Sequence, residues 1–204
     1  MMRISGWSAL ALAITATSLQ SQSVSRHGSW FSAGVGYGGA KSLCDSCSGE
    51  GRIGGTIVSL RAGTFLSSSF RLGGALEGWV HSYNGASELM ANTFATLTYT
   101  IRGLSDFFIP DGSFLTVGLG LSNYRSEIVR HVADTVPGLS GLGWGFTLGV
   151  GYDVSLSRHF ALTPTGNYVR GYVGDLNRTD GGGGYTTGWK QSYYDVRVSL
   201  TWNP

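Results

Sequence analysis

Residues 143–154, GWGFTLGVGYDV, alternate bulky apolar side chains with small or polar ones. The bulky residues are Trp144, Phe146, Leu148, Val150, Tyr152 and Val154, and between them stand Gly143, Gly145, Thr147, Gly149, Gly151 and Asp153. Successive side chains of a β-strand point to opposite faces, so the stretch predicts a strand with one apolar face and one small or polar face. Glycine on a water-facing surface would weaken the strand without adding solubility. The pattern therefore favours a narrow closed barrel with small residues inside and bulky residues facing lipid.

The same alternation recurs along the chain between turn-forming segments. The other segments lie near residues 30–38, 54–65, 70–83, 89–101, 114–124, 160–169 and 192–202. Short turns are expected at 67–69 and 156–159, and longer loops at about 125–141 and 171–190, on the side of the barrel that faces outside the cell. Pro164, inside one of the segments, removes a ladder donor and predicts an edge or a bulge there. With 143–154 counted, eight strands in an up-and-down meander are expected.

Closure follows from the physics of a sheet in lipid. Every backbone polar group must be paired within the bilayer, and only a barrel leaves no open edge. No stretch of the chain reaches the roughly 18 consecutive apolar residues that a membrane-spanning helix requires. Eight strands enclose an interior that side chains just fill, so a wide pore is not expected. The sequence therefore predicts an all-β, eight-stranded antiparallel transmembrane barrel.

Length and charge restrict the function classes. The 204 residues suggest one folded domain, and the formal net charge is only +2, with 13% charged residues. Such a balance gives no electrostatic footprint for nucleic acid. The first residues, MMRISGWSALALAITATSLQSQSVS, place Arg3 before a short apolar stretch, as in a secretory signal peptide. We expect a signal peptide over 1–23, cleaved after Ser18 or Ser23, and a barrel domain over 24–204.

The two cysteines form the motif CDSC, Cys44 to Cys47. A pair this close in an exported chain predicts a local disulfide in a loop. A zinc site would need a second pair of ligands nearby, and a redox motif would need a helix in an α/β context. The sequence offers neither.

These features together resemble the small outer-membrane β-barrels of the OmpA/OmpX type. GWGFTLGVGYDVSLSRHFALTPTGNYVRG resembles their penultimate hairpin, and YYDVRVSLTW resembles the C-terminal strand signal that the barrel-assembly machinery recognises. The resemblance covers nearly all of the chain after the signal peptide. It implies residence in the bacterial outer membrane, with membrane lipid and the assembly machinery as partners.

Charged residues fall on the predicted inner face of the barrel. They are Arg61, Glu77, Asp153, Asp195 and Arg197. An arginine that faced lipid near the bilayer centre would cost about 2–4 kcal/mol, whereas opposite charges inside can pair. Arg61 is expected to pair with Glu77 because their strands share a hairpin, and Arg197 with Asp195 or Asp153. The set predicts a structural ionic plug or a narrow ion path.

Aromatic side chains are expected at the two membrane interfaces. Tyr37, Trp144 and Tyr194 are assigned to the outer one, and Tyr99, Tyr152 and Trp202 to the periplasmic one. Amphipathic rings gather at these two levels in membrane barrels. The alternative is that they form the core of an ordinary sandwich.

The sequence predicts no catalytic, cofactor-binding or metal-binding residues. His81 and Ser82 suggest the lipid A deacylases, but adjacent residues of a strand point to opposite faces and cannot form a nucleophile–base pair. His27, His131 and His159 form no ligand cluster, and GVGYGG is followed by no helix that would make it a dinucleotide site.

The function expected from the sequence is a monomeric outer-membrane barrel with a structural or interaction role and no catalysis. Three alternatives stay open. They are a narrow porin-like channel, a barrel enzyme acting on envelope lipid, and a soluble lipocalin-like binder with its apolar residues inside.

Overall fold

The computed structural model describes residues 28–45, 51–83, 86–102, 112–128 and 138–204, which form nine β-strands. They are β1 (Ser29–Leu43), β2 (Ile53–Phe65), β3 (Phe70–Tyr83), β4 (Ala86–Thr100), β5 (Ser113–Ile128), β6 (Leu139–Tyr152), β7 (Val154–Ser155), β8 (Phe160–Arg178) and β9 (Gly184–Trp202). Over these residues no helix is long and apolar enough to cross a membrane. The predicted signal peptide, 1–23, lies outside the described residues.

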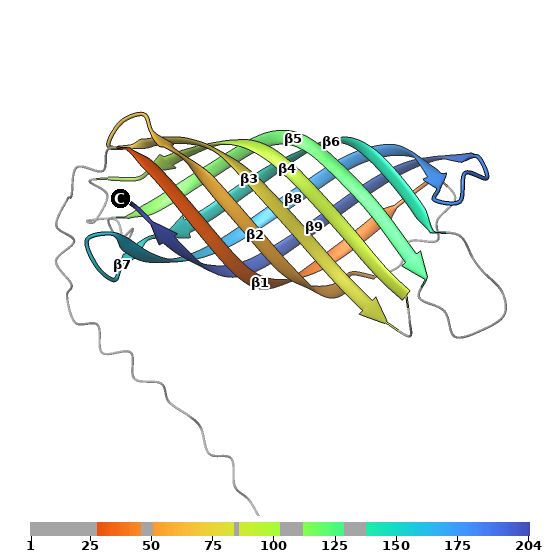
Figure 1. Ribbon diagram of the computed structural model, residues 1–204, viewed down its shortest axis with the longest axis horizontal. Helices are drawn as coiled ribbons and strands as arrows, with labels where there is room; N and C mark the ends of the chain where they lie inside the picture. Colours follow the sequence, from red (N-terminus) through yellow and green to blue (C-terminus); the bar gives the residue numbers. More distant parts are fainter. Residues whose placement is uncertain (1–27, 46–50, 84–85, 103–111, 129–137) are drawn as a thin grey trace, which may run out of the picture.

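The sheet closes on itself (Figure 1). Consecutive long strands pair antiparallel, β1 also pairs with β9, and β6 pairs with β8. The two-residue β7 continues the line of β6 and pairs with the start of β8. Eight long strands thus make an antiparallel up-and-down barrel, which confirms the predicted fold class.

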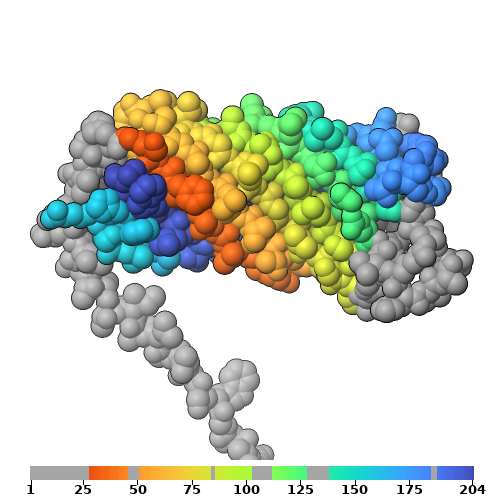
Figure 2. Space-filling model, in the orientation of Figure 1, coloured from red at the N-terminus to blue at the C-terminus, as the bar shows by residue number. Residues whose placement is uncertain are grey.

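The two ends of the barrel differ. β1 starts and β9 finishes at one end, here named the terminal end, where the turns at 66–69 and 156–159 also lie. The turn between β8 and β9 projects from the other end, the hairpin end, and its blue atoms lie at the right-hand end of the molecule in Figure 2. An even number of strands in a meander places both termini at the same end.

The strands at the hairpin end are longer than the sequence pattern predicts. The expected long loop over 171–190 is wrong: β8 continues to Arg178, β9 begins at Gly184, and Asn177 pairs with Gly184. Apolar and polar residues stop alternating clearly there, because the inner face becomes apolar at Val173 and Leu176 and two irregularities of the ladder, between Tyr172 and Leu176, shift the phase of β8. In the other expected loop, β5 continues to Ile128 and β6 begins at Leu139, and residues 129–137 lie outside the described part of the chain.

Pro164 marks the one interruption between β6 and β8 that the described residues show in the apolar part of the wall. The ladder runs to Gly151 opposite Thr165 and resumes at Val154 opposite Leu162. Pro164 has no backbone N–H to donate across this gap. The irregularity predicted at Pro164 is therefore a short break that separates β7 from β6 without a change of register.

The two faces of the wall differ as the stretch 143–154 predicts. Trp144 and Val150 are 55% and 57% exposed on the outer face, while Thr147 and Asp153 are 1% and 6% exposed in the lumen. Inner glycines make the narrow lumen possible. A Cβ on Gly36 would lie 2.4 Å from the carbonyl oxygen of Val196 and 2.5 Å from the Cβ of Arg197. The absent side chain leaves room for the arginine of the neighbouring strand.

Candidate functional site

The lumen at mid-height holds five interlinked polar side chains, named here the central cluster. They are Arg61, Glu77, Asn167, Asp195 and Arg197. β2, β3, β8 and β9 supply them from positions whose side chains alternate inward. Their carboxylates and guanidinium groups are almost wholly shielded, because the side chain of Glu77 is 0% exposed and that of Arg197 is 1% exposed.

Glu77 is the acceptor at the centre of this cluster. Arg61 Nη2 lies 2.6 Å from Glu77 Oε1, as the shared hairpin of β2 and β3 suggests. Arg197 reaches the same carboxylate from β9, with Nη1 3.0 Å from Oε1 and Nη2 3.1 Å from Oε2. One carboxylate therefore joins strands that are not neighbours in the sheet.

Asp195 completes the pairing of Arg197. Arg197 donates from Nε to Oδ1 at 2.8 Å and from Nη2 to Oδ2 at 2.9 Å. Asn167 donates to Asp195 Oδ1 at 3.1 Å and accepts from Arg61 at 3.2 Å. These contacts form a closed circuit across the lumen, and every charged member has an oppositely charged partner.

Asp153 lies apart from the central cluster, toward the terminal end. The interpretation that Arg197 could reach it is wrong: Asp153 Oδ2 lies 3.2 Å from Arg71 Nη1, and its Oδ1 accepts from Thr163 at 2.8 Å. Arg71 is missing from the site residues predicted from the sequence. Arg71 is an even number of positions from Glu77 on β3, so both side chains point inward. This alternation could have identified Arg71 as a lumen residue from the sequence.

Hydroxyl groups fill the lumen around this second pair. Thr163 and Thr201 are 3.0 Å apart, Thr201 donates to Ser32 at 3.0 Å, and Thr98 and Thr116 are 2.9 Å apart. A cavity of about 30 Å³ lies among them, enough for about one or two water molecules. The terminal end of the lumen is thus polar and nearly filled.

Toward the hairpin end the lumen becomes apolar. The side chains that fill it, named here the apolar plug, are Ile57, Trp79, Met90, Tyr124, Val173 and Leu176. Trp79 is fully buried and donates its indole N–H to the carbonyl of Gly38 at 3.2 Å. A chain of hydrogen bonds through Tyr193, Asn92, Ser122 and Gln191 separates the plug from the central cluster.

The aromatic residues predicted for the interfaces face outward. Trp202 pairs with Phe31 and Phe160, and Tyr99 packs on Phe70 with ring centroids 5.0 Å apart, all at the terminal end. Tyr152, opposite Ser113, lies at this end as well. Trp144 stacks on Tyr172 toward the hairpin end, with ring centroids 4.5 Å apart, and Tyr194 also lies toward this end. Tyr37 pairs with Val196, which places it two strand positions nearer mid-height than Tyr194.

His81 has a structural role at the hairpin end of the lumen. Its Nδ1 is 2.8 Å from the carbonyl oxygen of Gly54, and its ring stacks between Trp79 and Tyr83. Among the described residues, no group of three His, Cys, Asp or Glu side chains is placed to hold a metal ion. Cys44 is disulfide-bonded, and Cys47 lies outside the described residues.

The rim of the hairpin end carries exposed ion pairs. Arg125 lies within 2.5 Å of Glu127, and Arg178 donates twice to Asp180, at 3.1 and 2.6 Å. The hydrogen bonds from Arg178 hold the pKa of the Asp180 carboxyl below its usual range. Each pair lies within one strand or turn, so these contacts shape the rim and do not close the lumen.

No protein-family model matches the sequence, and no curated protein is recognisably similar to it. Solved structures are similar in fold. The chain has the fold of the small outer-membrane β-barrels. The outer membrane protein AlkL in lipid bilayers aligns with a TM-score of 0.55 at 10% identity, over 99% of this chain and 95% of AlkL.

Two further barrels align over most of this chain. Neisserial surface protein A has a TM-score of 0.51 at 15% identity, over 83% of this chain and 96% of its own. Ail, the attachment invasion locus protein of Yersinia pestis, in complex with the heparin analogue sucrose octasulfate, has a TM-score of 0.51 at 9% identity, over 85% and 98%. At these identities the likeness concerns the fold.

Proposed function

We propose that the protein is an integral outer-membrane barrel that does not conduct and does not catalyse, and that acts through structural or interaction roles at its hairpin end. The outward apolar belt and the resemblance of the fold to outer-membrane barrels support this location. In a meander whose termini face the periplasm, the hairpin end faces outside the cell. The fold suits such a role, since Ail, named for attachment and invasion, shares it.

The observation that carries the proposal is the central cluster. Arg197 and Glu77 span the lumen between β9 and β3 and are 1% and 0% exposed. An ion crossing at mid-height would have to displace paired charges that are buried in a low dielectric, where separating them is costly. The apolar plug then adds a dry barrier above the cluster.

Conductance tests the proposal against the channel alternative. The mature chain is reconstituted in planar lipid bilayers, and insertion is verified by the different gel mobility of unheated and boiled samples in SDS. We expect no discrete current steps. Steps whose size changes in Arg61→Gln or Glu77→Gln would overturn the proposal and establish an ion path through the cluster. A chain recovered from the soluble periplasm with a single gel band would overturn the membrane location itself.

A further inference from the structure

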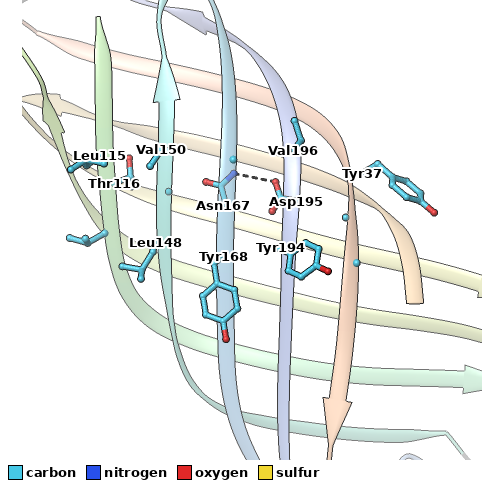
Figure 3. Close-up of a pocket in the computed structure, with 15 residues that line it drawn as sticks. Tyr37, Leu115, Thr116, Leu148, Val150, Asn167, Tyr168, Tyr194, Asp195 and Val196 are labelled. Carbon is cyan, nitrogen blue, oxygen red and sulfur yellow. Dashed lines mark hydrogen bonds between the residues drawn. The ribbon is translucent and has the colours of Figure 1, made fainter. Parts of the chain in front are cut away.

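A groove of about 830 Å³ crosses the outer wall over β5, β6, β8, β9 and β1 (Figure 3). Gly166 forms its floor, in register with Val150 on one side and Val196 on the other. A Cβ on Gly166 would have its nearest neighbours 3.9 and 4.0 Å away, so the position is open. The next row toward the hairpin end, Leu148, Tyr168 and Tyr194, borders the groove. Its size is that of a ligand pocket, about 300–1,000 Å³, and its walls are apolar side chains.

Four basic residues, named here the basic patch, stand on the hairpin-end side of this groove. Lys41 and Arg170 both pair with Ser192. Lys190 pairs with Tyr172, two strand positions nearer the hairpin end. Lys41, Arg170 and Lys190 share the strand phase of the outward residues Tyr37, Tyr168 and Tyr194, so they face outward too. Arg52 is the fourth member, and it joins them from the segment before β2.

Arg52 and Arg170 are held against the wall. Arg52 Nη1 donates to the carbonyl of Gly39 at 3.1 Å, and its guanidinium carbon lies 4.2 Å from the centre of the Tyr194 ring. The guanidinium carbon of Arg170 lies 5.3 Å from the centre of the Tyr172 ring. Because these cations are seated on aromatic faces, they are preorganised beside the groove.

Among the described residues, the outward positions of these two rows carry no carboxylate. Between and beside the basic residues stand Ser192, Tyr172, Leu43, Phe146 and Trp144. Two described carboxylates lie beyond the row of Lys190: Asp45, which lies against Gly188, and the exposed Asp175, which follows Gly174 on β8. The patch therefore presents positive charge to whatever lies in front of it.

The patch lies at membrane-interface height. Ser192 is ten positions from Trp202, which stands in the aromatic row of the terminal end. At about 3.3 Å per residue and a strand tilt of about 40°, the two rows are about 25 Å apart along the barrel axis, the height of the apolar band of a membrane barrel. The groove is inside this band, and the patch is at its outer edge.

We propose that this surface binds an anionic lipid of the outer leaflet, with its phosphate on the basic patch and an acyl chain in the groove. Cations at the interface attract anionic headgroups, and the apolar groove below them suits the chain of the same molecule. A second copy of the barrel is disfavoured as occupant, because a two-fold axis along the membrane normal would bring two basic patches face to face. The inference goes beyond the proposed function, and it holds whether or not the lumen conducts.

Lipid retention in native mass spectrometry tests the headgroup half of the proposal. The mature barrel in neutral detergent is titrated with phosphatidylglycerol and, separately, with zwitterionic phosphatidylcholine of the same chains. Arg170→Gln with Lys190→Gln should weaken phosphatidylglycerol binding about 30-fold, since each cation near an anionic surface contributes about fivefold in affinity. The matched control, Arg125→Gln with Arg178→Gln, removes two charges from the rim pairs and should leave binding unchanged.

The acyl-chain half needs a second pair of variants. Gly166→Leu fills the groove floor and should weaken lipid binding. Gly74→Leu is the control, because Gly74 is also outward and open, with its nearest atom 3.8 Å from a built Cβ, but lies on β3. Inorganic phosphate should displace the lipid poorly from the unaltered protein.

Four results would overturn the proposal. They are equal binding of the two lipids, equal losses in the two charge variants, full displacement by inorganic phosphate, and a dimer that disappears in Gly166→Leu. The third would indicate a phosphate site without a chain, and the fourth a second copy on the groove. Folding of each variant is verified by its gel mobility before and after boiling.

Discussion

At mid-height the lumen is closed by paired charges around Glu77, whereas toward the hairpin end it is closed by Trp79 and other apolar side chains. Both regions are buried, yet they respond differently to the loss of one member. A buried ion cluster leaves uncompensated charge when a partner is removed. An apolar cluster loses contacts and leaves a cavity, which its neighbours can partly fill. We therefore expect single substitutions in the central cluster to destabilise the barrel more than single substitutions in the apolar plug.

The largest effect is expected at Glu77. Glu77→Ala should lower the free energy of unfolding by about 3–5 kcal/mol, because Arg61 and Arg197 both lose their shared carboxylate. The measurement is urea-induced unfolding in lipid vesicles, followed by tryptophan fluorescence. Glu127→Ala is the control, since its pair with Arg125 is about half exposed on both sides and should contribute at most about 1 kcal/mol. If Glu77→Ala costs no more than this control, the cluster does not stabilise the barrel.

A smaller effect is expected at Trp79. Trp79→Ala should cost about 3 kcal/mol, the low end of the range for a buried tryptophan, because flexible neighbours in the plug such as Met90 can partly fill the cavity. Trp79→Phe should recover much of this loss, although it gives up the hydrogen bond to Gly38. The same unfolding measurement applies. A loss for Trp79→Ala well above that for Glu77→Ala would reverse the comparison.

The fold was predictable from the sequence because the membrane imposes a strict period of two on every strand. Residues 70–83 match β3 at both ends, since the apolar residues Phe70, Leu72, Leu76 and Val80 share the outward phase of the strand. β8 and β9 were underestimated toward the hairpin end, because β8 turns apolar residues, Val173 and Leu176, to the lumen there and irregularities of the ladder shift its phase. The local sequence pattern therefore predicts the strands only over the part of the wall that lipid covers.

The lumen contacts divide in the same way. The approach of Arg61 to Glu77 follows from one hairpin, in which their strands are neighbours. The contact of Arg197 with Glu77 crosses 120 positions of the chain and two intervening strands, β2 and β1. It depends on the stagger of the closed barrel, which no local pattern specifies. Arg71 could have been included by phase alone, but its pairing with Asp153 could not.

The smallest effect concerns how the two arginines share Glu77. Double-mutant cycles with Glu77→Ala should give coupling free energies between about 0.5 and 3 kcal/mol, with Arg197→Ala near the top of the range and Arg61→Ala near the bottom. Arg61 is 12% exposed, so its charge is partly solvated, whereas Arg197 is 1% exposed and also holds Asp195. Unfolding free energies of the single and double variants provide both cycles.

Equal couplings would contradict this order and would mean that the hairpin pair and the cross-lumen pair are screened alike. A larger coupling for Arg197 would mean that the central cluster stabilises the barrel mainly through the contact between Arg197 and Glu77, which forms only in the closed barrel. Since that contact joins β9 to β3, it can form only after the first and last strands have met. The central cluster would then stabilise the complete barrel relative to any partly assembled sheet. The apolar plug does not need this role, because its side chains tolerate repacking.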